Sequence, residues 1–95
     1  MKYLLILFIL LWANISYAEI ILEVESDKYI FITEQYQVKS NDTLESITYD
    51  FMEKNTYGFR EFNEFKEGII ENNQQLTTRD VIPNELLIIT YWVKK

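Results

Sequence analysis

Length, charge and composition limit this chain to one small acidic domain. It has 95 residues, 9 basic and 15 acidic side chains, a net charge of −6 and neither cysteine nor histidine. The acidic balance argues against nucleic acid and anionic lipid as partners, because both are bound through Lys and Arg. Without cysteine and histidine, the usual nucleophile–base pairs and metal-ligand clusters are missing, so we expect no enzyme, no metal and no cofactor. Stability must come from apolar packing, since no disulfide can form.

The N-terminal segment, residues 1–18, has the parts of a signal peptide. Lys2 supplies a positive start, Tyr3–Trp12 is an unbroken apolar run, and Ser16 and Ala18 have the small-residue spacing of a cleavage site. We therefore expect cleavage after Ala18 and a secreted, periplasmic or cell-envelope location. The alternative is an uncleaved membrane anchor, which is disfavoured because polar residues interrupt the run before it is long enough to span a bilayer.

Strand-forming residues open and close the mature chain. Glu19–Glu25 and Tyr29–Thr33 are rich in β-branched and aromatic residues, and Ser26–Lys28 between them is typical of a turn, which predicts a β-hairpin. Gln35–Lys39 alternates polar and apolar residues and predicts a separate short strand. Near the C-terminus, Leu86–Val93 predicts the last strand.

Two helical patterns lie between these strands. The first starts in a turn cluster where Asp42 is a good N-cap and Glu45 can reach back to it, and we expect it to end within Glu53–Asn55. The second covers Phe59–Asn72. The order β-β-β-α-α-β predicts an α+β fold, with two helices packed on one face of an antiparallel sheet.

The aromatic residues divide into an expected core set and an expected surface set. The helical and strand patterns place four rings in the core: Tyr36, Phe51, Phe62 and Phe65. Four others are candidates for the surface, where a glycan or a protein partner can stack on them: Tyr49, Tyr57, Tyr91 and Trp92. Trp92 can equally cover the N-terminal hairpin.

Two motifs flank the helical patterns. The first, Tyr36–Ile47, has a Tyr-x-Val strand, then Asp-Thr-Leu and an Ile; the second has Asn73 and continues as Val-Ile-Pro-Asn and an aliphatic strand over Val81–Ile89. Together they resemble the LysM domain, a small βααβ carbohydrate-binding module of cell-wall proteins. Asn41 and Asn84 stand where the family pattern has glycine, and Asn tolerates the left-handed backbone region better than most residues.

The resemblance implies a LysM-like βααβ fold extended by an N-terminal β-hairpin. The chain then divides into a signal peptide at 1–18, a hairpin extension at 19–35 and a LysM-like domain at 36–95. The segment 60–73 is similar to that of small exported LysM proteins, which include suppressors of cell division.

The resemblance also implies non-catalytic binding of N-acetylglucosamine-containing cell-wall glycan, that is, peptidoglycan. It places the site between the loop after the first strand and the loop before the last, at Asn41, Asp42, Thr43, Leu44, Thr78, Arg79, Val81, Ile82 and Pro83. Some of these residues also suit structural roles: Asp42 and Thr43 a helix start, Leu44 the core, and Arg79 a solvated surface. The alternative is an exported protein-interaction or regulatory module that has lost sugar binding and captures a protein partner through the hairpin.

Overall fold

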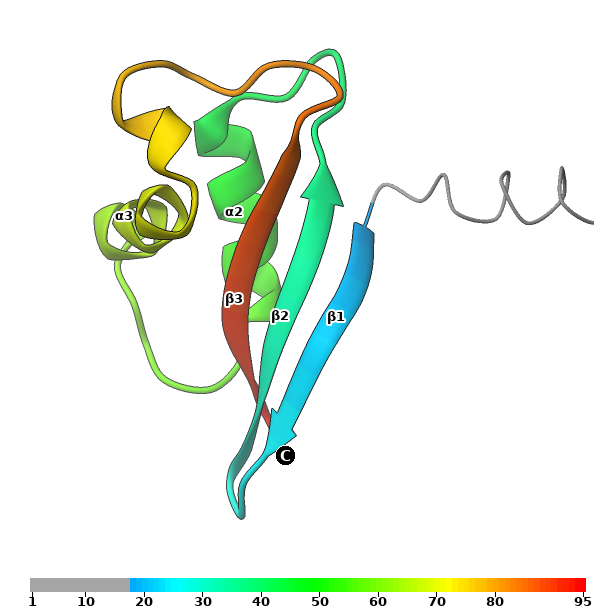
Figure 1. Ribbon diagram of the computed structural model, residues 1–95. Helices are drawn as coiled ribbons and strands as arrows, with labels where there is room; N and C mark the ends of the chain where they lie inside the picture. The colour runs from blue at the N-terminus through cyan, green and yellow to red at the C-terminus, as the bar shows by residue number, and fades with distance from the viewer. Residues whose placement is uncertain (1–17) are drawn as a thin grey trace, which may run out of the picture.

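The computed structural model describes residues 18–95, which form a three-stranded antiparallel sheet and two α-helices (Figure 1). The predicted signal peptide lies outside these residues, apart from Ala18, which begins the first strand. The elements in chain order are β1 (Ala18–Glu25), β2 (Tyr29–Gln37), α2 (Leu44–Lys54), α3 (Phe62–Asn72), the short 3₁₀ helix η1 (Gln74–Thr77) and β3 (Leu86–Lys94). The strand order is β1-β2-β3, so β2 is central. The α+β class with two helices and an antiparallel sheet is as predicted.

Strands β1 and β2 form the predicted hairpin. Ser26 closes the turn, because its amide donates to the Tyr29 carbonyl at 2.9 Å. Beyond the turn, β2 pairs with β1 on one side and with β3 along its full length on the other. No helix within residues 18–95 is long and apolar enough to cross a membrane.

The prediction of two separate strands within residues 29–39 is wrong, because β2 is a single strand. The charged residue Glu34 lies in the middle of β2, where an apolar residue would be expected, and this makes the strand look interrupted in the sequence. Glu34 is only 3% exposed, and its carboxylate accepts hydrogen bonds from the Tyr91 hydroxyl at 2.7 Å and from Lys54 Nζ at 3.1 Å. A charged residue thus occupies a core-facing position, and the predicted boundary after Gln35 falls inside β2.

Helix α2 begins with a cap different from the predicted one. Thr43 is the N-cap: its Oγ1 accepts from the Ser46 amide at 3.1 Å, and Ser46 Oγ accepts from the Thr43 amide at 3.0 Å. The prediction that Asp42 caps the helix is wrong, because its carboxylate accepts instead from the Lys39 amide and the Tyr36 hydroxyl. The helix ends within the predicted range.

Helix α3 begins at Phe62, later than predicted. The preceding segment is held against β3, where the amides of Thr56 and Tyr57 donate to the Trp92 carbonyl at 2.9 and 3.1 Å. Gly58 has a φ of +78°, which is a left-handed conformation incompatible with a helix. These contacts keep residues 56–60 in a loop and delay the helix.

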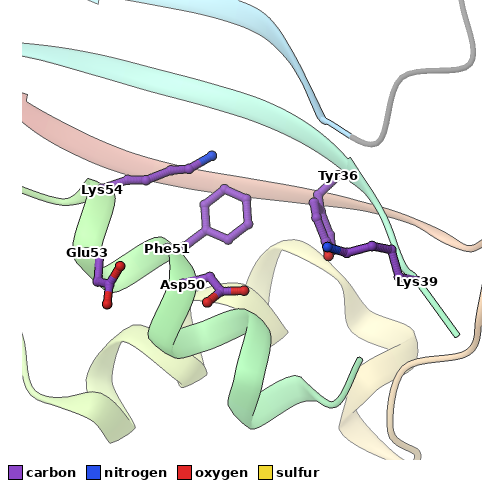
Figure 2. A pocket seen from close by; sticks show the side chains of 6 residues that line it. All are labelled: Tyr36, Lys39, Asp50, Phe51, Glu53 and Lys54. Carbon is purple, nitrogen blue, oxygen red and sulfur yellow. The ribbon is translucent and has the colours of Figure 1, made fainter. Parts of the chain in front are cut away.

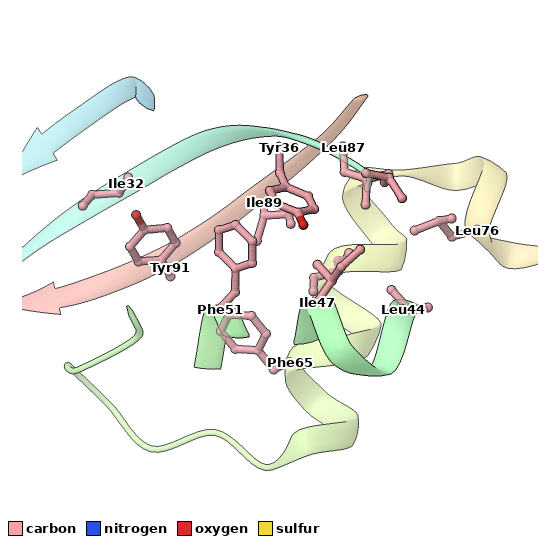
Figure 3. Packing of buried hydrophobic residues seen from close by; sticks show 12 residues of the cluster. Ile32, Tyr36, Leu44, Ile47, Phe51, Phe65, Leu76, Leu87, Ile89 and Tyr91 are labelled. Carbon is pink, nitrogen blue, oxygen red and sulfur yellow. The ribbon is translucent and has the colours of Figure 1, made fainter. Parts of the chain in front are cut away.

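The core lies between the helices and one face of the sheet (Figure 3). Tyr36, Phe51 and Phe65 are buried as predicted, whereas Phe62 is half-buried. Tyr91 was predicted at the surface but is 4% exposed, because its ring packs beside Phe51 at a centroid distance of 5.8 Å. The buried apolar side chains are Ile32, Tyr36, Val38, Leu44, Ile47, Phe51, Phe65, Ile69, Leu76, Leu87, Ile89 and Tyr91.

Candidate functional site

Two loops that are far apart in the sequence meet at one end of the sheet (Figure 1). The first, residues 38–43, leads from β2 into α2, and the second, residues 78–85, leads into β3. At their base, the Val38 amide donates to the Glu85 carbonyl at 2.9 Å, and the Asn84 amide donates to the Val38 carbonyl at 2.7 Å. Asn84 has a φ of +72°, the left-handed conformation that Asn tolerates, and it turns the second loop into β3. Both loops therefore leave the sheet from one fixed junction.

Asp80 joins the second loop to the start of helix α2. Its Oδ1 accepts hydrogen bonds from the Leu44 amide at 3.1 Å and from the Val81 amide at 2.7 Å. Leu44 is the first residue of α2, and the first amides of a helix have no partner inside it. A carboxylate at this position satisfies one such amide and interacts favourably with the helix dipole. Asp80 therefore ties the second loop to the start of the helix that follows the first loop.

Asp42 determines the shape of the first loop. Its Oδ2 accepts from the Lys39 amide at 2.8 Å and from the Tyr36 hydroxyl, and its amide donates to the Lys39 carbonyl at 3.1 Å. Burial, together with the hydrogen bond to the Asp42 carboxylate, raises the pKa of the Tyr36 hydroxyl above its ordinary value. Tyr36 therefore stays protonated and keeps donating to Asp42 at physiological pH.

Arg79 and Glu85 form an ion pair within the second loop and stabilise its conformation. Arg79 Nη1 and Nη2 donate to the two Glu85 carboxylate oxygens at 3.1 and 2.9 Å, and Nη1 also donates to the Asp80 carbonyl at 2.9 Å. Glu85 Oε1 accepts in addition from the Ile82 amide at 2.9 Å. The hydrogen bonds from Arg79 hold the pKa of the Glu85 carboxyl below its usual value, against the opposing effect of partial burial. The Arg79 cation is thus engaged by its own loop.

The structure brings the predicted site residues together on these two loops. Leu44 differs from the rest, because its side chain is 5% exposed and belongs to the core. Asp42 and Val81 are half-buried. The six that are exposed are Asn41, Thr43, Thr78, Arg79, Ile82 and Pro83.

The exposed part of the loops offers mainly neutral groups to a ligand. The carboxylates of Asp42, Asp80 and Glu85 accept hydrogen bonds from groups of the protein itself. Arg79 is paired with Glu85. Hydroxyl, carboxamide and apolar side chains remain at the surface, including Ile82 at 48% exposure, together with the ammonium of Lys39. Such a surface suits a ligand with hydroxyl, amide and methyl groups better than a strongly charged one.

A groove of about 510 Å³ borders the first loop and runs between β2 and α2 (Figure 2). Tyr36 and Phe51 form its apolar part; their rings meet edge to face at a centroid distance of 5.6 Å. Its polar lining comes from Lys39, Asp50, Glu53 and Lys54. The volume falls within the range of small-ligand sites. The groove depends on how α2 lies against the sheet, so no local sequence pattern predicts it.

A second groove, of about 360 Å³, lies at the opposite end of the sheet and is lined mainly by aromatic residues. The Arg60 guanidinium stacks over the Trp92 ring at 4.2 Å, and the Tyr29 and Tyr57 rings are 4.9 Å apart. Phe59 beside them is 91% exposed. The expectation that Tyr57 and Trp92 reach the surface is met only in part, since both are half-buried.

Sequence reasoning missed two residues that organise the loops, Asp80 and Glu85. A weak signal exists for Asp80, because Thr-Arg-Asp before an apolar run is loop-like and Asp commonly accepts from nearby backbone amides. Nothing local pairs Asp80 with Leu44, which lies 36 residues earlier. For Glu85, its pairing with Arg79 six residues before it follows from the turn that Asn84 makes.

Comparison with known proteins adds no relative: no family model, no curated protein and no solved structure matches the chain. Among residues 18–95, no group of three or more Asp and Glu side chains is placed to hold a metal ion.

Proposed function

We propose that this chain is an exported LysM-like module that binds N-acetylglucosamine-containing cell-wall glycan without cleaving it. The observation that carries the proposal is the meeting of the 38–43 and 78–85 loops, which the resemblance designates as the two walls of the sugar site. The loops are braced by hydrogen bonds before any ligand arrives, which lowers the entropic cost of binding.

The chemistry of the loop surface supports the same ligand class. An N-acetyl group requires apolar contact for its methyl and neutral hydrogen-bonding partners for its amide. Ile82 and Pro83 are exposed apolar residues on one loop, and Asn41 and Thr43 are exposed polar residues on the other. Because Asp42, Asp80, Glu85 and Arg79 make their hydrogen bonds within the loops and only the Lys39 ammonium remains exposed, we expect binding to depend little on salt.

Sedimentation of the full-length chain with purified, insoluble peptidoglycan tests the proposal. We expect the protein in the pellet at both low and high salt. Ile82→Ser should weaken binding about fivefold, because covering the half-exposed Ile82 side chain contributes about 1 kcal/mol. The matched control is Ile21→Ser, since Ile21 on β1 is 49% exposed and Ile82 is 48% exposed.

Two results would contradict the proposal. One is recovery of all the protein in the supernatant at both salt concentrations. The other is an equal loss of binding in Ile82→Ser and Ile21→Ser, which would show that any exposed apolar side chain attaches the protein to the wall.

A further inference from the structure

The two edges of the sheet differ in how far the rest of the chain covers their backbone groups. On β3, Asn73 accepts from the Ile88 amide at 2.9 Å and donates to the Ile88 carbonyl at 2.8 Å. Further along, Asn55 Oδ1 accepts from the Trp92 amide at 2.8 Å, and the Thr56 amide donates to the Trp92 carbonyl at 2.9 Å. This edge therefore has partners for its outward backbone groups at Ile88 and Trp92, and the covering segments close it to a further strand.

The opposite edge, β1, has no such cover. Its only neighbour among the elements of residues 18–95 is β2, and no loop or side chain of that region hydrogen-bonds to its backbone. Figure 1 shows it on the side of the sheet away from both helices. Natural edge strands are commonly protected by charged side chains, Pro or bulges; β1 carries neither Lys nor Pro, and its charges are the carboxylates of Glu19, Glu23 and Glu25. A register irregularity between Ile20 and Leu22 leaves Leu22–Glu25 as the regular free stretch.

The register of the hairpin divides the side chains of this stretch by chemistry. Leu22 and Val24 lie opposite Thr33 and Phe31, on the face without helices. Val24 is 50% exposed and extends an apolar row that continues through Phe31 to Trp92, with Phe31–Trp92 centroids 5.0 Å apart. Aliphatic side chains of an added strand would lengthen this row.

The other face of the same stretch is acidic. Glu23 and Glu25 lie opposite Ile32 and Ile30, on the face that carries the helices. Glu25 accepts a long hydrogen bond from Lys95 Nζ at 3.3 Å, in an exposed pair that contributes little. Basic side chains of an added strand on this face would stand beside two carboxylates.

We propose that β1 accepts a fourth strand from a partner: an extended segment in which basic and aliphatic residues alternate. Backbone hydrogen bonds along Leu22–Glu25 would supply affinity, and the division of the two faces would supply specificity. A second copy of this chain fits less well. If its helices lay on the same face, antiparallel pairing would set Glu23 opposite Glu23 or Glu25 of its twin, and like charges directly opposite are destabilising.

The inference does not depend on glycan binding. Leu22–Glu25 pairs with the first half of β2, next to the hairpin turn, whereas the 38–43 and 78–85 loops lie beyond the far end of β2 (Figure 1). Either activity can therefore fail while the other remains.

The probes are three synthetic six-residue peptides. One alternates Lys and Val, one has the same composition with its Lys and Val in separate blocks, and one alternates Glu and Val. Each is titrated into the ¹⁵N-labelled full-length chain, and amide shifts and hydrogen exchange are recorded. We expect the alternating Lys–Val peptide to bind at least tenfold more tightly than the block peptide and to protect β1 amides that exchange quickly without it.

The double variant Glu23→Lys/Glu25→Lys separates strand pairing from general attraction between a polycation and an acidic protein. We expect its preference to reverse, with the Glu–Val peptide bound at least tenfold more tightly than the Lys–Val peptide. The matched control is Glu67→Lys/Glu71→Lys, which changes the net charge equally at two exposed positions on α3 and should keep the original preference. Both double variants should still sediment with peptidoglycan if the wild-type chain does.

Three results would overturn the inference. The block peptide binding as tightly as the alternating one would show that strand pattern is irrelevant. An equal loss of Lys–Val peptide binding in both double variants would reduce the effect to net charge. Concentration-dependent protection of β1 amides without peptide would identify a second copy as the occupant.

Discussion

Replacing Asp80 by alanine should detach the second loop from helix α2. The change removes an acceptor from the Leu44 amide at 3.1 Å and from the Val81 amide at 2.7 Å. Hydrogen bonds to charged groups contribute about 1.5–3 kcal/mol when well shielded, and Asp80 is exposed, so the lower part of that range applies. The loss of a carboxylate at a helix start adds about 0.3–1 kcal/mol. We expect a total decrease of about 2 kcal/mol in the free energy of unfolding.

Chemical denaturation of the full-length chain, followed by circular dichroism, measures this decrease. A loss of about 2 kcal/mol corresponds to a fall in Tm of roughly 8–16 °C for a domain of this size. Asp80→Asn keeps a neutral Oδ1 acceptor and should lose about half as much. Asp27→Ala is the control, because Asp27 is exposed in the hairpin turn and its side chain has no hydrogen bond within residues 18–95. Its effect should stay within about 0.5 kcal/mol.

Unfolding of Asp80→Ala and Asp27→Ala at the same denaturant concentration would contradict the predicted role of Asp80. Hydrogen exchange at the Leu44 amide gives an independent check, because that amide should exchange faster in Asp80→Ala than in the wild-type chain. Unchanged exchange would mean that the bond to Asp80 does not hold the helix start in solution.

Two further predictions concern residues that join distant segments. Asn73→Ala should lower the free energy of unfolding by about 2–3 kcal/mol, because the Ile88 amide, the Ile88 carbonyl and the Ile69 carbonyl each lose a hydrogen bond to the Asn73 side chain. Chemical denaturation measures this loss, and a value below about 0.5 kcal/mol would contradict the prediction. For Glu85, a folded pKa below the unfolded value of about 4.3 gives stability that is present above that pH and lost as pH falls through the lowered pKa. Arg79→Gln should therefore reduce the loss of stability between pH 6 and pH 3, measured as denaturation midpoints, and an identical loss in both proteins would count against the ion pair.

Local patterns were sufficient for much of the fold. The β-hairpin, the end of α2 and the strand before the C-terminus were predicted because each depends on side chains within a few residues: β-branched runs, turn residues and helical spacing. The left-handed backbone expected from Asn at the two glycine positions is found at Asn84, whereas Asn41 has no positive φ.

Local patterns do not predict which of several possible hydrogen-bond partners a side chain will bind. Asp42 was predicted to cap α2 because it is a good cap in isolation, yet Tyr36 and the Lys39 amide occupy its carboxylate, and Thr43 caps instead. Neither of the predicted strands, Tyr29–Thr33 and Gln35–Lys39, includes Glu34. Glu34 is buried because Tyr91, 57 residues later, supplies a hydrogen-bond donor for its carboxylate. In both cases the deciding group lies on another element or another part of the loop.

The same division holds for the candidate site. The motifs locate the two segments of the site, residues 41–44 and 78–83, because the resemblance places the sugar site beside them. Three other features follow from the folded chain and from no local motif: Asp80 bonds to Leu44 across 36 residues, Arg79 pairs with Glu85, and one edge of the sheet is covered while β1 is open. Hydrogen-bond partners and burial depend on distances in space, and a linear pattern of residue types constrains those distances only within a single helix, strand or turn.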